Sequence, residues 1–173
     1  MPKIIIVSGP NGAGKTSFAR ELLAATPDSY AFVNADEIAR ELRIAGEPPA
    51  NIDITAARAM LVRLDALTAA GRDLMFETTL ATLTYKRKIP IWQTAGYSVG
   101  LIYLRLPDVE SSIARVARRV AAGGHDIPEA TIRQRFGRSL DYLERHYKPI
   151  VDEWYVCDSL EGDVRISLSW RDA

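Results

Sequence analysis

The chain has 173 residues, 47% of them hydrophobic and 25% charged, which is the balance of a globular protein and predicts one domain over residues 1–173. Lysine plus arginine and aspartate plus glutamate both total 22, so neither nucleic acid nor a membrane surface is expected as a partner, and no stretch is long and apolar enough to span a bilayer. The single cysteine, Cys157, excludes an intramolecular disulfide and favours a reducing, cytoplasmic setting.

The first predicted elements surround a glycine-rich loop. Residues 3–7 form a short β-branched apolar run, which is typical of a strand buried on both faces. Apolar residues at helical spacing predict a helix after the loop, ending at Pro27. Between them the sequence matches G-x-x-x-x-G-K-[ST], a pattern that wraps nucleotide phosphates; its residues are Gly9, Pro10, Asn11, Gly12, Ala13, Gly14, Lys15, Thr16 and Ser17.

This loop predicts a bound nucleoside triphosphate, ATP or GTP, together with Mg²⁺. Its glycines let successive backbone N–H groups turn inward as an anion cradle, and the following helix adds its positive N-terminal end. In this pattern Lys15 reaches the β- and γ-phosphates, and the Thr16 hydroxyl completes the Mg²⁺ shell.

Strands and helices alternate along the rest of the chain. The predicted strands lie at residues 30–33, 74–76, 98–104, 154–157 and, as an edge strand, 164–170. The predicted helices lie at about 36–45, 55–70 and 84–95, then from the Asp108 cap to Val120 and from Ile132 to Leu143. This order predicts an α/β doubly wound parallel sheet of the P-loop kinase type, with helices on both faces and the ligand crevice at the carboxyl ends of the strands.

Asp36 follows the second predicted strand and would therefore face the phosphate loop across the crevice. A carboxylate at that position could take the proton of an acceptor hydroxyl, whereas it would repel an acceptor phosphate. Asp36 therefore favours a hydroxyl acceptor. Capping of the next helix is the alternative role for this residue.

Glu77 and Thr78 end the third predicted strand. Glu77 would orient the acceptor or hold Mg²⁺ through water, with a structural cap as the alternative. The Thr78 hydroxyl would bind substrate or simply complete the strand.

An arginine-rich region over about residues 115–135 predicts a lid around a pair of glycines. Arg115 and Arg119 lie four residues apart, a like-charge pair that destabilises a helix unless an anion lies near it. Arg135 also lacks an acidic neighbour at helical spacing. Such arginines would close over the transferred phosphoryl group and neutralise its charge, and His125 in the hinge would contact phosphate or substrate.

Two other arginines in or just after this region have acidic neighbours. Arg133 follows Glu129 by four residues, and Arg138 precedes Asp141 by three. Ordinary ion pairs on a helix surface explain both.

Four blocks of sequence, taken in order, resemble the zeta toxin-like P-loop kinases. They are G-P-N-G-A-G-K-T-S, F-V-N-A-D-E-I-A, F-E-T-T-L and G-G-H-D-I-P-E-A-T-I-R-Q-R-F, and they cover about residues 3–157. The resemblance implies ATP- or GTP-dependent phosphorylation of a small hydroxylated molecule, which in characterised zeta toxins is a UDP-linked N-acetyl amino sugar. It also implies a small antitoxin protein that blocks nucleotide binding.

The same resemblance assigns roles to individual residues: Lys15 matches the phosphate-loop lysine, Asp36 the catalytic base, Glu77 a substrate-side acid and Arg119 one of two lid arginines. The second lid arginine of those toxins falls at or near His125. Arg135 would replace it. The chain is also shorter than the toxins.

The sequence as a whole predicts a small cytoplasmic kinase that phosphorylates a hydroxyl group. A nucleotide monophosphate kinase is the alternative within the class, and a nucleotide-binding regulatory module without a transfer substrate is the alternative outside it. The guanine-specific sequence N-K-x-D, which would favour the module, does not occur, and no predicted strand ends in the Asp of a Walker B motif.

Overall fold

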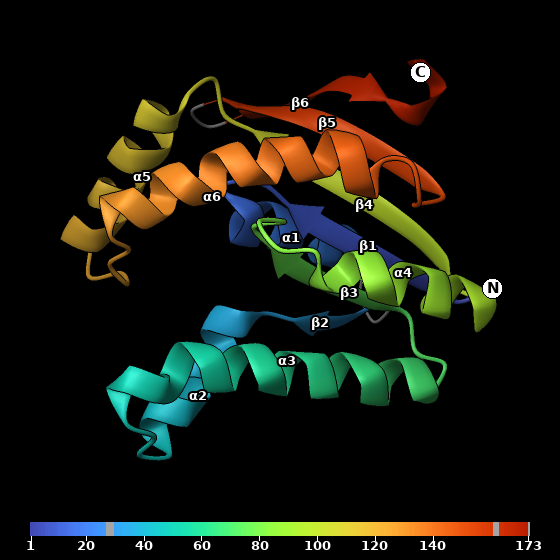
Figure 1. Ribbon diagram of the computed structural model, residues 1–173, viewed down its shortest axis with the longest axis horizontal. Coiled ribbons are helices and arrows are strands. Elements are labelled where there is room, and N and C mark those ends of the chain that lie inside the picture. The colour runs from blue at the N-terminus through green and yellow to red at the C-terminus, as the bar shows by residue number, and fades with distance from the viewer. Residues whose placement is uncertain (27–29, 161–162, 173) are drawn as a thin grey trace.

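The computed structural model describes residues 1–26, 30–160 and 163–172, and its strands form one sheet in the order β2-β3-β1-β4-β5-β6 (Figure 1). The strands are β1 (Lys3–Ser8), β2 (Ala31–Val33), β3 (Leu74–Thr78), β4 (Ser98–Arg105), β5 (Glu153–Leu160) and β6 (Asp163–Ser169). The first five run parallel, and β6 pairs antiparallel with β5. The predicted doubly wound sheet is confirmed.

Helices cover both faces of this sheet, with α4 and α6 in front of it and α1 behind it in Figure 1. They are α1 (Lys15–Ala25), α2 (Ala35–Ile44), α3 (Ile52–Ala69), α4 (Thr84–Thr94), α5 (Val109–Ala121) and α6 (Glu129–Tyr142). Short turns of helix occupy Pro49–Asn51, Leu143–Tyr147 and Trp170–Asp172. Pro27, the predicted end of the first helix, lies outside the described residues.

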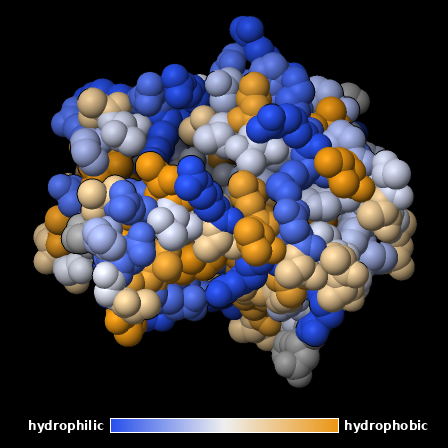
Figure 2. Space-filling view, turned by 60° about the horizontal axis from the view of Figure 1, so that its bottom comes forward, coloured by the Kyte–Doolittle hydropathy of each residue, from blue (hydrophilic) through white to orange (hydrophobic). Residues whose placement is uncertain are grey.

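The central strands are apolar on both faces because each face meets a helix layer. Ile6 and Phe76 belong to the larger core cluster with α3 and α4, whereas Val7 and Met75 pack on Ala19 of α1. All five side chains are buried. The other face of α3 is exposed, and the side of the molecule that α2 and α3 form shows hydrophobic residues interspersed with hydrophilic ones (Figure 2).

Two helix starts follow from capping chemistry. Asp108 Oδ1 accepts from the backbone N–H of Ser111 at 2.7 Å, as the sequence predicts for α5. At α2 the cap is Asn34, not Asp36: Asn34 Oδ1 accepts from the Asp36 N–H at 2.7 Å. The backbone leaves the helical region at Asn34, so the cap position falls there and the Asp36 side chain is not used as a cap.

The phosphate loop leaves the sheet at the point where the chain order reverses. β1 lies between β3 and β4, with Ser8 opposite both Thr78 and Tyr103. In open α/β sheets ligands bind in the crevice at such a switch point. The fold therefore places the residues after β1 beside those that end β2 and β3.

Gly9→Ala should lower the free energy of unfolding by about 2–6 kcal/mol, because strain and overlap add. Gly9 has φ of 139°, and a Cβ atom there would lie 2.3 Å from the backbone oxygen of Leu104. Gly71→Ala is the matched control: Gly71 also has a positive φ, 67°, but a Cβ would meet nothing within 4 Å, so a loss of about 1–2 kcal/mol is expected. Urea denaturation of both variants measures the difference, and equal losses would contradict the close approach of β1 and β4.

Candidate active site

The phosphate loop is a tight turn between β1 and α1. Gly9, Gly12 and Gly14 all have positive φ values, which glycine adopts at little cost. Lys15 folds back over the loop, and its Nζ donates to the carbonyl oxygens of Gly9 at 3.0 Å and Pro10 at 2.8 Å. Its ammonium group thus lies inside the turn that would hold the phosphates.

A chain of hydrogen bonds joins the first turn of α1 to the ends of β3 and β2. Thr16 Oγ1 donates to Glu77 Oε2 at 3.0 Å, and Asn34 Nδ2 donates to Glu77 Oε1 at 2.8 Å. Asn34 in turn accepts from the Asp36 N–H. Burial raises the pKa of Glu77, while Lys15 and the Thr16 bond act against that rise. Asn34 is buried and is the residue of this site that sequence reasoning missed, although an Asn before a helix is a recognised capping signal.

The electrostatic surroundings of Lys15 show which predicted residues the fold brings together. Burial lowers the pKa of Lys15 to about 8; the carboxylates of Glu77 and Asp36 oppose this, and the guanidinium groups of Arg119 and Arg135 add to it. These residues come from α1, β3, α2, α5 and α6. All of them therefore lie within electrostatic reach of the phosphate loop.

The low pKa of Lys15 predicts a pH dependence of nucleotide affinity. Phosphates bind the charged lysine, so affinity should stay constant below about pH 8 and fall by about tenfold per pH unit above it, up to the higher pKa of the bound state. The last ionisation of a phosphate, with pKa about 6, is complete in that range. Titration calorimetry with Mg²⁺-ATP from pH 7 to 10 tests this, with Lys15→Arg as the control that should stay flat. A flat wild-type curve would contradict it.

The Thr16–Glu77 pair offers oxygen ligands of the kind that Mg²⁺ prefers, a hydroxyl and a carboxylate. No group of three or more His, Cys, Asp and Glu that could hold a metal by itself occurs in the described part of the chain. Mg²⁺ in phosphate-transfer sites commonly takes one or two protein ligands and completes its shell with phosphates and water. The residues present therefore fit a nucleotide-bound Mg²⁺.

The Asp36 carboxylate is exposed on the first turn of α2. No hydrogen bond or ion pair of this carboxylate occurs among the described residues. The cap of α2 is Asn34, and the neighbouring Arg20 pairs with Glu37 instead of Asp36. Asp36 therefore remains available to an acceptor at the edge of the crevice.

The hinge region places Arg119 and His125 together. Arg119 Nη2 donates to the backbone oxygen of His125 at 3.0 Å, while the His125 residue itself is exposed. Gly124 makes this turn possible, because a Cβ there would lie 2.7 Å from Arg119 Cγ. Arg135 is half-buried on α6 and has no hydrogen bond or ion pair within the residues described. Arg119 is therefore bonded to the turn between α5 and α6, and no hydrogen bond from its side chain to the phosphate loop occurs among the described residues.

Arg115, one of the arginines predicted to close over the phosphoryl group, is bonded in the structure to a serine of another element. Arg115 Nη1 donates to Ser159 Oγ at 3.0 Å and Nη2 to the Ser159 carbonyl at 2.9 Å. Sequence spacing tests only partners on the same helix, whereas Ser159 lies at the end of β5.

The two arginines expected to make ordinary helix pairs differ in outcome. Arg133 pairs with Glu129 at 2.8 Å, as predicted, and also with Glu110 of α5 at 2.9 Å. Asp141, the predicted partner of Arg138, instead pairs with Arg145 at 2.8 Å. Arg145 lies four residues after Asp141, the favourable order for an acid and a base on a helix.

The segment after Glu77 is held by unusual local geometry. Thr78 Oγ1 accepts from the backbone N–H of Leu80 at 3.1 Å, and buried Leu80 has φ of 60°, rare for a side chain branched beyond Cβ. Such strain persists where surrounding contacts impose it, and here Ser139 Oγ donates to the Thr79 carbonyl at 2.6 Å. The Thr78 hydroxyl therefore has a structural role in the turn after β3, and it still has a proton to donate.

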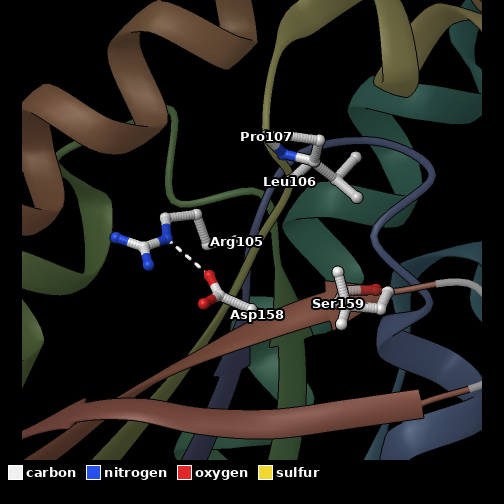
Figure 3. A pocket seen from close by; sticks show the side chains of 6 residues that line it. Arg105, Leu106, Pro107, Asp158 and Ser159 are labelled. Atoms are coloured by element: carbon white, nitrogen blue, oxygen red, sulfur yellow. Dashed lines mark hydrogen bonds and ion pairs between the residues drawn. The ribbon is translucent and has the colours of Figure 1, made fainter.

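A hollow of about 440 Å³ lies beside the loop rather than over Lys15, at the ends of β4 and β5 (Figure 3). Arg105 and Asp158 form an ion pair of 2.7 Å on one side of it, and Ser159 lies on the other.

Across the described ranges, every helix is too short or too polar to serve as a transmembrane span.

Comparison with known proteins gives a family match. A family model described as AAA domain matches residues 4–139. An uncharacterized protein of Haemophilus influenzae is 28% identical over 137 residues, which is 78% of this chain and 92% of that protein.

Solved structures share the fold at lower identity. One, from a characterization of the PezAT chromosomal toxin–antitoxin system of Streptococcus pneumoniae, is 20% identical with a TM-score of 0.73, covering 100% of this chain and 74% of that one. AvrRxo1-ORF1:-ORF2 with ATP is 17% identical with a TM-score of 0.75, covering 98% and 58%. A gluconokinase from Sinorhizobium meliloti 1021 is 17% identical with a TM-score of 0.57, covering 91% and 83%. At these identities the likeness shows the P-loop kinase-like fold.

Proposed function

The chain belongs to the AAA domain family, and from that premise we propose that it is a P-loop kinase that transfers the γ-phosphoryl group of ATP or GTP to a hydroxyl of a small molecule. The observation that carries this proposal is the arrangement around Lys15. The Lys15 ammonium lies on the carbonyls of the phosphate loop, Thr16 and Asn34 both bond to Glu77, and the charges of Glu77, Asp36, Arg119 and Arg135 act on Lys15 from four other elements of the fold. A phosphoryl-transfer site needs this combination of charges.

Each residue has a role that its position supports. The amides of the loop and Lys15 would bind the phosphates, and Thr16 with Glu77 would hold Mg²⁺, which when bound neutralises charge on the phosphate oxygens. Asp36 would orient the acceptor hydroxyl and take its proton. Arg119 and Arg135 would neutralise charge on the transferred group, and Arg119 must first leave the His125 carbonyl.

The acceptor side favours a neutral group over a phosphate. Glu77 and Asp36 lie on the side of the loop that β2 and β3 form, and two carboxylates there would repel a phosphate in the position of the accepting group, whereas a hydroxyl of a molecule that is charged elsewhere is tolerated. Thr78, at the end of β3, and His125, between α5 and α6, would contact the acceptor. The resemblance to zeta toxin-like kinases makes a UDP-N-acetyl amino sugar the first acceptor to test. It also makes an antitoxin protein the first partner to test.

A transfer screen with radiolabelled ATP and GTP tests the proposal. The panel contains UDP-N-acetyl amino sugars, free sugars, aminoglycosides, nucleosides and nucleoside monophosphates, each with and without Mg²⁺. The proposal expects labelled product from at least one hydroxyl acceptor. Labelled product from monophosphates alone would support a nucleotide monophosphate kinase, and slow hydrolysis that no acceptor stimulates would support a regulatory module.

A further inference from the structure

Three consecutive carbonyl groups of the phosphate loop accept hydrogen bonds from side chains far away in the sequence. Ser112 Oγ of α5 donates to the Asn11 oxygen at 2.5 Å, and Ser159 Oγ of β5 donates to the Ala13 oxygen at 2.9 Å. Between them, Arg115 Nη1 lies 3.5 Å from the Gly12 oxygen, at the limit of a hydrogen bond. Both serines are buried, with exposed fractions of 0% and 3%.

Arg115 joins the two sides of this arrangement. Its guanidinium group donates to both the hydroxyl and the carbonyl oxygen of Ser159. The Ser159 hydroxyl therefore accepts a hydrogen bond from Arg115 while it donates one to the Ala13 carbonyl. Gly12 allows the close approach, since a Cβ there would lie 2.9 Å from Arg115 Cβ. The loop is thus packed directly on α5 and tied to the end of β5.

These bonds fix the direction of the loop amides. In a peptide unit the C=O and the following N–H point in opposite directions. Bonds that hold the Asn11 and Ala13 oxygens toward α5 and β5 therefore turn the Gly12 and Gly14 N–H groups the other way. Neither of these N–H groups donates to a protein acceptor among the described residues, and both are free for an anion. Preorganised donors of this kind bind without reorganisation when the anion arrives.

We propose that Arg115 and Ser159 are positioning residues that orient the amides of the phosphate loop and tie the loop to the helix that carries Arg119. The proposal rests on the proposed function, in that the loop must bind phosphate. Arg119 follows Arg115 by one turn of α5. The contact that orders the loop therefore also fixes the position of the Arg119 backbone relative to the loop. Arg115 itself points at Ser159 and the outer side of the loop and would not touch the phosphates.

The test measures binding of inorganic pyrophosphate and of Mg²⁺-ATP by calorimetry for the wild type, Arg115→Ala, Ser159→Ala and the double variant. Each single variant should weaken both ligands by about tenfold, the range of hydrogen bonds made by charged groups. The double variant should bind each ligand about as tightly as the single variant with the lower affinity, because the two residues act as a unit. Arg165→Ala removes the same charge from an exposed pair with Asp163 and should leave affinity unchanged.

Two further readouts separate positioning from a general loss of stability or of charge. Amide resonances of Gly12 and Gly14 should shift between wild type and Arg115→Ala before any ligand is added, with the far strands unchanged. Arg115→Lys keeps the charge but loses the two-point contact, so it should restore little affinity. Full affinity in Arg115→Lys, or additive losses in the double variant, would overturn the positioning role.

The two proposals fail in different ways. A wild type that binds neither pyrophosphate nor Mg²⁺-ATP would overturn the proposed function and the positioning role with it. A wild type that binds both, with unchanged affinity in Arg115→Ala and Ser159→Ala, would overturn the positioning role alone.

Discussion

Asp36→Asn is expected to lower the rate of transfer to a hydroxyl acceptor by about 10²- to 10⁴-fold, the usual contribution of a general base. The amide has the same shape as the carboxylate but cannot accept the acceptor's proton. Because Asn34 caps α2 and the Asp36 carboxylate has no bond within the described residues, the fold should tolerate the change. Steady-state kinetics with the acceptor from the screen gives kcat, and calorimetry should show Mg²⁺-ATP affinity within about threefold of wild type, a shift below 1 kcal/mol.

Glu37→Gln is the matched control, because it removes the same charge from the next residue. Glu37 forms an exposed ion pair of 3.4 Å with Arg20, a contact of little energetic value. Its kcat should stay close to that of the wild type. Equal losses in both variants would mean that Asp36 acts only through its charge at a distance. Full activity in Asp36→Asn would exclude it as the base and favour an acceptor that is itself a phosphate.

The sheet and its switch point could be predicted because their signals are local. The β-branched run of residues 3–7, the glycine pattern and the helix after it lie within one short stretch, and each follows from its own periodicity. The sequence also indicated Asp36 and Glu77, since residues that follow parallel strands must meet at one edge of the sheet. These two were placed by topology, without knowledge of any side-chain contact.

The contacts that organise the loop could not be predicted, because they join residues distant in the sequence. Ser159 reaches Ala13 across 146 positions, and Arg115 reaches Ser159 across 44. A serine in a strand has no pattern that reveals such a bond. For Arg115, the absence of an acid at helical spacing indicated a nearby anion, but a serine on another element accepts from its guanidinium group as well.

Lys15→Ala should abolish most transfer activity without weakening the fold. The Lys15 ammonium lies on the carbonyls of the phosphate loop. Its removal takes away the cation that the proposed function places on the phosphates, and we expect a loss of about 10²- to 10³-fold in kcat, as for other single stabilising groups. Because burial holds the pKa of Lys15 near 8, below its ordinary value, the folded protein keeps this charge at neutral pH at a cost. At pH 7 the buried charge lowers the stability of the fold, and it is relieved only as pH rises through 8, whereas the two bonds to the Gly9 and Pro10 carbonyls raise stability. Because these contributions oppose each other, the alanine variant should unfold at about the same temperature as the wild type at pH 7. Lys15→Arg retains a cation and is the control, with an intermediate loss of kcat. Thermal unfolding at pH 7 and 10 with single-turnover kinetics gives both quantities. A Lys15→Ala variant that is much less stable but keeps full activity would show that this lysine serves the fold rather than the phosphates.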